Sequence, residues 1–253
     1  MTPTRSAART AGRTDGGGRR AIVTGAARGI GLGLATRLVE EGYDTTLVDV
    51  DRCVESAAAA LDASFAVIDL TAADASTRLN ALVDAEPCWL LVNNAGIFDK
   101  TPLLEIDLAE WDRVQAVNAR SMVATMQAVV PSMVGAGGGR VVNMASMAAK
   151  VGTPGEAAYA ASKAAVVALS RIAATEFGGH GITVNSVCPG YVLTDMGADT
   201  RDDEQVAGWV SMSPLGRLAN ADDIASLVIY LASDGASYIT GQALNVTGGM
   251  CTN

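Results

Sequence analysis

The chain has 253 residues, which is enough for one large α/β domain or two small ones, each with a proper core. Hydrophobic residues make up 49% and aromatic residues only 4%, so the core is aliphatic, as in helix-covered parallel sheets. The net charge is −9 although residues 1–20 carry five Arg, and so acidic a body argues against nucleic acid, anionic membrane or an acidic carrier protein as partners.

The cysteines and the histidine exclude further classes of site. Cys53, Cys88, Cys188 and Cys251 form no C-x-x-C pair, and His180 is the sole histidine. We therefore expect no metal centre and no histidine-based triad. Isolated cysteines are typical of a reducing compartment, and no apolar run approaches the ~18 residues of a membrane span, so a cytoplasmic location is expected.

The first segment, residues 1–19, lacks the apolar stretch of a secretory signal. It is rich in Arg, Ser and Thr, so a transit peptide stays open, but a disordered tail is favoured. The folded domain is then expected to span residues 20–253.

The first half of the domain alternates short apolar runs with helical periodicity. Expected strands, each followed by an expected helix, are Ala21–Val23 with Ile30–Glu41, Thr45–Val50 with Val54–Leu61, and Phe65–Ile68 with Leu79–Ala85. A Gly-rich turn, Thr24 to Gly31, joins the first strand to the first helix. Such a turn lets backbone approach a pyrophosphate, and the helix N-terminus offers free N–H groups.

Asp49 lies 18 residues beyond Gly31, at the end of the second expected strand. A carboxylate there accepts hydrogen bonds from the ribose hydroxyls and repels a 2′-phosphate, so it favours NAD over NADP. Arg28, inside the turn, could instead meet a 2′-phosphate. Asp51 and Arg52 lie close by, and the sequence does not decide which side chains face the ribose.

The second half continues the same pattern. Its expected elements are the strand Trp89–Val92, the helix Leu108–Met133, the strand Arg140–Asn143, the helix Ala157–Phe177, the strand Thr183–Val187, the helix Ala221–Ala232 and the strand Ala243–Val246. This alternation predicts an α/β fold: a single doubly wound Rossmann domain with a parallel sheet of about seven strands and helices on both faces. The two long helices carry more apolar residues than one sheet face requires, which indicates a homo-oligomer, a dimer or a tetramer; a thicker core is the alternative.

Four motifs occur together in a recognisable order. They are the G-x-x-x-G-x-G turn, Asn93-Asn94-Ala95-Gly96, a Ser ahead of Tyr159-x-x-x-Lys163, and Pro189-Gly190. Each alone is weak, but the set resembles the short-chain dehydrogenase/reductase family from about Arg20 to the C-terminus. Trp89, where the family usually has an acidic residue, and Arg120-Ser121 depart from its pattern.

The resemblance implies a catalytic set and a cofactor site. The catalytic residues would be Ser146, Tyr159, Lys163 and Asn118, with Asn118 holding a water that links Lys163 to solvent. Besides Tyr159 and Lys163, the cofactor would contact Gly25, Arg28, Gly29, Ile30, Gly31, Asp49, Asp69, Leu70, Asn94, Ala95, Gly96, Pro189, Gly190, Val192 and Thr194.

The residues themselves suit proton transfer. Tyr159 and Lys163 are four apart on an expected helix, so they share one face. A phenol has a pKa near 10, and a nearby ammonium is expected to lower it toward neutrality. Ser146, 13 residues before Tyr159 at a strand end, can hold the substrate oxygen.

The substrate is expected under a lid at about residues 191–214, which is mostly acidic and has few apolar anchors. Glu156 is placed to face the site mouth, with a solvated loop carboxylate as the alternative, and Arg171 is the only basic residue in Ala164–Phe177. These features favour an NAD-dependent enzyme acting on a small secondary alcohol or ketone, such as a polyol, sugar or diol. The alternatives are a 3-oxoacyl thioester reductase using NADPH and a non-enzymatic dinucleotide-binding module.

Overall fold

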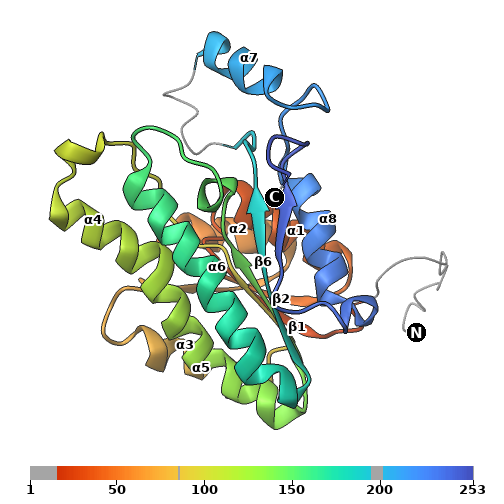
Figure 1. Cartoon of the computed structure of the whole chain (residues 1–253). Coiled ribbons are helices and arrows are strands. Elements are labelled where there is room, and N and C mark those ends of the chain that lie inside the picture. Colours follow the sequence, from red (N-terminus) through yellow and green to blue (C-terminus); the bar gives the residue numbers. More distant parts are fainter. Residues whose placement is uncertain (1–15, 85, 195–201, 253) are drawn as a thin grey trace.

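The computed structural model describes residues 16–84, 86–194 and 202–252. Its centre is a seven-stranded parallel sheet in the order β3-β2-β1-β4-β5-β6-β7 (Figure 1). The strands are β1 (Arg20–Thr24), β2 (Asp44–Asp49), β3 (Ser64–Val67), β4 (Leu90–Asn93), β5 (Gly139–Met144), β6 (Ile182–Pro189) and β7 (Ala243–Val246). The predicted fold class, a single parallel sheet with helices on both faces, is confirmed.

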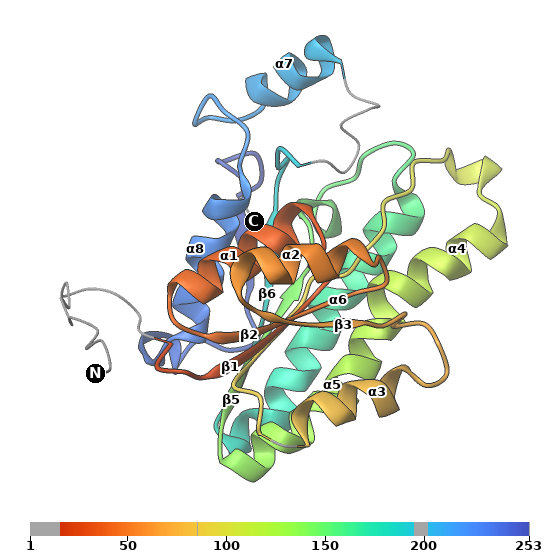
Figure 2. The same ribbon diagram turned by 180° about the vertical axis from the view of Figure 1, so that it is seen from behind.

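Helices cover both faces because every central strand is apolar on both sides. Ala21 and Val23 of β1 point into one core while Ile22 points into the other. One face carries α1 (Gly29–Glu40), α2 (Cys53–Leu61) and α8 (Ala221–Ala232). In Figure 2, α1 and α2 lie in front of the sheet and α8 lies beside it. The opposite face carries α3 (Ala75–Val83), α5 (Ser121–Ala136) and α6 (Ala157–Phe177).

The long helix predicted over 108–133 is divided. The structure has α4 (Leu108–Gln115), then a five-residue π-helical turn, η2 (Ala116–Arg120), and then α5. A further helix, α7 (Asp203–Ser211), stands apart from the sheet at the end where the strands finish (Figures 1 and 2). The helix predicted at 79–85 begins earlier, at Ala75.

The packed chain extends slightly into the predicted tail. Gly16 is buried, and its N–H donates to the Glu41 carbonyl at 2.8 Å, while Gly18 N–H donates to the Gly42 carbonyl at 3.1 Å. The prediction for residues 1–15 lies outside the described residues.

Trp89, which stands ahead of β4 where the family pattern has an acidic residue, has a structural role. Its indole N–H donates to the Ala232 carbonyl at 3.0 Å, and the guanidinium groups of Arg19 and Arg140 lie 3.9 Å and 4.6 Å from its ring centroid. The ring therefore joins β4 to α8 at the end of the sheet far from the Gly-rich turn, where cation–π contacts add to its packing.

By length and composition alone, the helical stretch Ala157–His180 is apolar enough to cross a membrane. In this fold its α6 part packs on β5 and β6, and 44% of its most apolar window is buried. A core helix of a sheet protein passes the same test.

Candidate active site

The candidate site lies where the direction of strand order reverses, between β1 and β4. In open parallel sheets, ligands bind in the crevice outside the carboxyl ends of the strands at this point. The Gly-rich turn follows β1, Asn94 follows β4, Ser146 follows β5 and Gly190 follows β6. The sheet topology thus brings motifs from four distant parts of the chain to one edge.

The Gly-rich turn has the close packing that glycine permits. Gly25 has φ +64°, and a Cβ there would lie 2.7 Å from Ala95 Cα. The N-cap of α1, Arg28, makes no side-chain cap bond, and the first turn, from Gly29, contains no acidic residue. The N-terminus of this 12-residue helix is therefore electrostatically suited to a pyrophosphate.

Asn94 fixes that turn against β4. Its Nδ2 donates to the carbonyl oxygens of Thr24 at 3.0 Å and of Gly25 at 2.9 Å. In return the Thr24 hydroxyl accepts from the N–H groups of Asn94 at 3.0 Å and of Ala95 at 3.1 Å. Thr24, which we did not predict as a site residue, is thus the second partner in these reciprocal hydrogen bonds. Its place directly before Gly25 was the signal in the sequence that could have identified it.

Asp49 ends β2 beside the turn, as predicted. Its Oδ2 accepts from Ala27 N–H and its Oδ1 from Asp51 N–H, both at 2.9 Å. Arg28 reaches across to Asp51, with Nη2 3.4 Å from Oδ2. The guanidinium that could meet a 2′-phosphate is therefore paired with a neighbouring carboxylate.

Asp69 lies beyond β3, and Leu70 packs partly into the core beneath it. The Asp69 Oδ1 accepts from Thr71 N–H at 2.8 Å and from the Thr71 hydroxyl at 2.7 Å. These hydrogen bonds hold the pKa of Asp69 below its usual range, so its carboxylate is charged near neutral pH.

Lys163, on α6, is 4% exposed, and its Nζ donates to the Met144 carbonyl at 2.8 Å. Burial lowers the pKa of Lys163 to about 8. Its Nζ lies 5.7 Å from the centroid of the Tyr159 ring, so the predicted pair does share one face of the helix.

Tyr159 departs from our expectation in one respect. Its pKa is raised, because burial of the phenol outweighs the Ser146 hydroxyl, which favours the ionised form; the charge of Glu156 raises it further. Ser146 itself accepts from Ala148 N–H at 3.1 Å. The phenol is therefore protonated near neutral pH, although we expected Lys163 to lower its pKa.

Asn118 is fully buried within the π-helical turn η2. Its Oδ1 accepts from Ile97 N–H at 2.8 Å, and its Nδ2 donates to the Ile97 carbonyl at 2.9 Å and to the Ser162 hydroxyl at 3.0 Å. A Cβ on Gly96 would lie 3.3 Å from both Asn118 Oδ1 and Lys163 Nζ. Gly96 thus allows Asn118 and Lys163 to lie against the same stretch of backbone.

Ser162 was missed by the sequence analysis. It is fully buried, and its hydroxyl donates to the Tyr159 carbonyl at 2.6 Å while it accepts from Asn118. It therefore joins η2 to the turn of α6 that carries Tyr159. Its position directly before Lys163 was the only signal in the sequence.

The segment after β6, predicted to contact the cofactor, packs against the end of β7, against the chain ahead of α8 and against the Gly-rich turn. Pro189 is the last residue of β6, Gly190 N–H donates to the Val246 carbonyl at 2.9 Å, and Val192 pairs with Ala219. A Cβ on Gly29 would lie 3.6 Å from Thr194 Cβ, so Thr194 reaches the Gly-rich turn from the other side.

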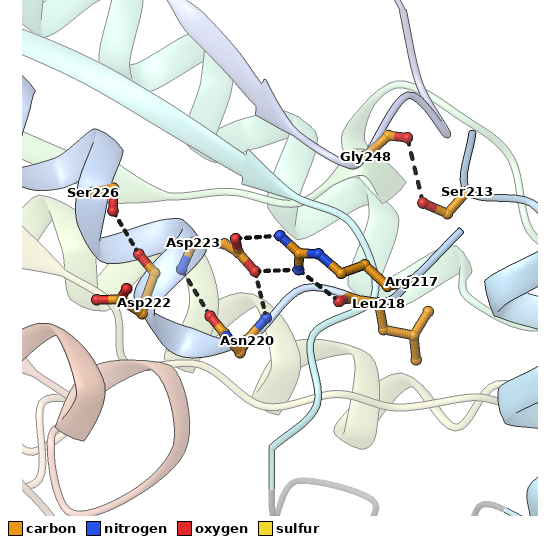
Figure 3. Close-up of polar contacts among 8 residues, drawn as sticks. All are labelled: Ser213, Arg217, Leu218, Asn220, Asp222, Asp223, Ser226 and Gly248. Carbon is orange, nitrogen blue, oxygen red and sulfur yellow. Dashed lines mark hydrogen bonds and ion pairs between the residues drawn. The ribbon is translucent and has the colours of Figure 1, made fainter. Parts of the chain in front are cut away.

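Of the predicted lid, residues 195–201 lie outside the described residues. In the part that is described, the Tyr191 and Trp209 rings stack with centroids 4.5 Å apart, which ties α7 to the end of β6. The returning chain is anchored where Arg217 donates to both carboxylate oxygens of Asp223 at 2.7 Å and the Ser213 hydroxyl donates to the Gly248 carbonyl (Figure 3). Across the described part of the chain, no cluster of three or more Asp, Glu, Cys or His is arranged to hold a metal ion.

The chain is similar to known proteins over most of its length. The family model described as enoyl-(acyl carrier protein) reductase matches residues 25–251. A 3-oxoacyl-[acyl-carrier-protein] reductase of Staphylococcus aureus is 38% identical over 242 residues, 92% of this chain and 98% of the relative. A gluconate 5-dehydrogenase of Gluconobacter oxydans is 36% identical over 242 residues, 92% of this chain and 94% of the relative.

A solved crystal structure is also similar to this chain over nearly its whole length. The crystal structure provisionally described as an NAD(P)-dependent gluconate 5-dehydrogenase from Beutenbergia cavernae, with NADP bound at low occupancy, has a TM-score of 0.89 and 37% identity. The match covers 92% of this chain and 96% of that one. With a family model and relatives above 30% identity spanning nearly the whole sequence, the chain belongs to the short-chain dehydrogenase/reductase family.

Proposed function

We propose that this oxidoreductase interconverts a small secondary alcohol and its ketone, with Tyr159 as the acid/base and NAD(H) as the preferred cofactor. The observation that carries this proposal is the cluster of Ser146, Tyr159, Lys163 and Asn118 beside a pyrophosphate-binding turn. Burial of Lys163 and the networks around Asn118 support it, because an unreactive surface pair needs neither.

The residues present suit a dinucleotide. The uncapped N-terminus of α1 provides N–H groups for the pyrophosphate, and Gly25 keeps the backbone clear of side-chain bulk. Asp49 and Asp69 would hold the adenosine half, and Pro189, Val192 and Thr194 the carboxamide. When bound, the nicotinamide supplies the hydride acceptor or donor.

In the oxidative direction, the Tyr159 phenolate accepts the proton of the substrate hydroxyl as the carbon loses its hydride. The Ser146 hydroxyl donates a hydrogen bond to the oxygen that becomes the carbonyl. Lys163 stabilises the phenolate, and Asn118 would hold the water through which that proton leaves. In reduction, the Tyr159 phenol returns a proton to the oxygen.

For the cofactor, two carboxylates at the end of β2 support NAD. Asp49 is fixed by Ala27 N–H, and Asp51 engages Arg28, so a 2′-phosphate would meet negative charge on both sides. NADP is the second candidate, because Arg28 lies beside the turn and the Beutenbergia structure contains NADP.

For the substrate, a small polyol, sugar or diol is our first choice. The acidic body and the exposed acidic residues of α7 favour a neutral hydroxylated molecule over an acidic carrier. The Gluconobacter relative is named for gluconate, a polyhydroxylated acid, so it supports the hydroxylated chain of the substrate and not its neutral charge. A 3-oxoacyl thioester reductase is the second candidate, supported by the Staphylococcus relative.

We further propose a cytoplasmic homo-oligomer, with a tetramer as the expected form. Val134 on α5 and Ile172 on α6 are exposed apolar residues on helices that cover one sheet face, which supports subunit packing there.

The test is formation of reduced cofactor, followed by absorbance, with purified enzyme, either NAD or NADP, and a panel of polyols, sugars and simple secondary alcohols. A 3-oxoacyl thioester with NADPH forms the second arm, in which consumption of the reduced cofactor is followed instead. Turnover of the panel with NAD is expected. Turnover of the thioester alone would favour the second candidate, and no turnover in either arm would contradict both.

A further inference from the structure

The carboxylate of Glu156, one helical turn before Tyr159, has no role in the mechanism proposed above. Glu156 is the N-cap of α6, yet its side chain makes no cap bond. The residue is only 9% exposed. Among the described residues, the carboxylate oxygens of Glu156 have neither a hydrogen-bond partner nor an ion-pair partner, and they remain accessible to solvent.

Glu156 precedes Tyr159 by three residues at the start of α6, so it lies beside the proposed acid/base. Its charge acts on the phenols of both Tyr159 and Tyr191. The ring of Phe98 lies edge-on to Tyr159 with centroids 5.0 Å apart, and Tyr191 stacks on Trp209. These rings surround Tyr159 and Tyr191, and a carboxylate whose charge acts on both phenols suits a hydroxylated carbon chain, whose O–H groups need acceptors and whose C–H faces pack on rings.

Lys100 is an opposite charge that acts on Glu156 without forming an ion pair with it. Burial raises the pKa of the Glu156 carboxyl, and Lys100 opposes that shift only in part. Residues next to Lys100 and Glu156 are hydrogen-bonded to each other, since the Thr101 N–H donates to the Gly155 carbonyl at 2.7 Å. Glu156 thus lies at a fixed position and keeps free acceptor oxygens.

We propose that Glu156 is a substrate-binding residue that accepts a hydrogen bond from a hydroxyl on the carbon next to the reacting one. The inference rests on the proposed function, since it requires Tyr159 and Ser146 to hold the reacting oxygen. With Glu156 one turn away on the same helix, the adjacent hydroxyl of a vicinal diol meets the carboxylate. The preferred substrate class is then a 1,2-diol, or the matching 2-hydroxyketone in reduction.

A different role for Glu156 is stabilisation of α6, because a carboxylate at a helix N-terminus interacts favourably with the helix dipole. That role predicts equal effects on all substrates. Matched pairs of substrates therefore separate the two roles: 2,3-butanediol with 2-butanol, and 1,2-cyclohexanediol with cyclohexanol.

The experiment compares kcat and KM for these four alcohols in the wild type, Glu156→Gln and Glu156→Met. We expect the wild type to prefer each diol. Glu156→Met, which has no acceptor oxygen, should lose about 10- to 100-fold in kcat/KM for the diols, mainly through KM, as for a hydrogen bond to a charged group. Glu156→Gln, which keeps one acceptor, should lose less. On the mono-alcohols neither variant should lose activity, because removing the Glu156 charge only takes away an interaction that raises the pKa of Tyr159.

Glu176→Gln, an exposed change on the same helix, is the matched control and should leave all four values unchanged. Equal losses on diols and mono-alcohols, or no wild-type preference for the diols, would contradict this inference and leave the proposed function standing. If no alcohol in either this set or the wider panel reduces the cofactor, the proposed function fails and this inference fails with it.

Discussion

Lys163 is the residue whose environment conflicts most with its charge. Its ammonium is buried at 4% exposure and has one carbonyl partner, Met144. A side chain kept charged in such a place lowers stability, and a strained, polar active site of this kind is where enzymes commonly lose stability for function.

Replacing Lys163 by Met should therefore raise the free energy of unfolding by about 1–2 kcal/mol at pH 7 while removing most activity. The buried-charge penalty, about 3 kcal/mol for a pKa of about 8, is offset in part by the lost hydrogen bond to Met144. Because the folded-state pKa is depressed, the gain should be full below pH 8 and disappear as pH rises toward 10.5.

Denaturant unfolding at several pH values measures this gain. Lys150→Met is the control, since Lys150 donates to the Ala243 carbonyl and to Asn245, and its loss should bring no gain. A less stable Lys163→Met at pH 7 would show that the ammonium is a net stabiliser.

The roles proposed for Ser146 and Tyr159 predict how the rate of the reaction responds to pH. Oxidation needs the phenolate, and the pKa of Tyr159 is raised by burial, so kcat/KM for oxidation should increase into the alkaline range while reduction declines. The Ser146 hydroxyl favours the phenolate, so in Ser146→Ala the rise should move to higher pH, and the maximal rate should fall. A rise that stays at the wild-type pH in this variant would contradict the contact between the two hydroxyls.

At the scale of elements, the regular strands and helices could be predicted from sequence because their apolar periodicity and glycine boundaries are local signals. The π-helical turn at Asn118 could not, because residues 108–133 have continuous helical periodicity and the extra residue per turn depends on tertiary bonds to Ile97 and Ser162. Helix α7 was also missed as an element, since its anchor, the Tyr191–Trp209 stack, joins distant residues.

Helix α8 is capped at its N-terminus by side chains. Its start is a capping box, in which Asn220 Oδ1 accepts from Asp223 N–H and Asp223 Oδ2 accepts from Asn220 N–H, both at 2.9 Å (Figure 3). Asn220→Ala should lower the free energy of unfolding by about 1 kcal/mol. Ser226→Ala, on the same helix, removes only a bond to the Asp222 carbonyl and should change stability far less.

Asp223 makes the same region sensitive to acid. Arg217 and the capping bond hold the pKa of Asp223 at about 2, below its usual 3.8. A depressed carboxylate contributes stability above pH 3.8 that is lost as pH falls toward 2, so Asp223→Asn should be less stable than the wild type at pH 6 and approach it near pH 2. Equal stability of the two proteins at pH 6 would contradict this role for the ion pair.

At the scale of the whole molecule, the sheet brings four motifs to one edge. This part of the site could be predicted because alternating strands and helices form a parallel sheet, in which the carboxyl ends of the strands share one edge. The electrostatics could not. The raised pKa of Tyr159 and the pairing of Arg28 with Asp51 depend on burial and side-chain direction, which the sequence does not encode locally.

Cofactor choice tests that electrostatic account. Asp51→Asn keeps the bond that Asp51 accepts from Cys53 N–H but removes the charge that pairs with Arg28. The ratio of kcat/KM for NADP to that for NAD should then rise about tenfold, as for a change of about 1.4 kcal/mol. Asp62→Asn, an exposed change at the end of α2, is the charge-matched control. An unchanged ratio would exclude Arg28 as the 2′-phosphate ligand.

In the proposed mechanism, the Tyr159 phenol transfers the proton while the hydride moves between the substrate carbon and the nicotinamide. The most direct measurement compares alcohol-dependent NADH formation by the wild type and by Tyr159→Phe, with Tyr230→Phe on the outer helix α8 as the control and cofactor binding followed by fluorescence. We expect Tyr159→Phe to lose about 10²- to 10⁴-fold in kcat while it binds NAD normally, and the control to match the wild type. A Tyr159→Phe enzyme with wild-type turnover would contradict the account.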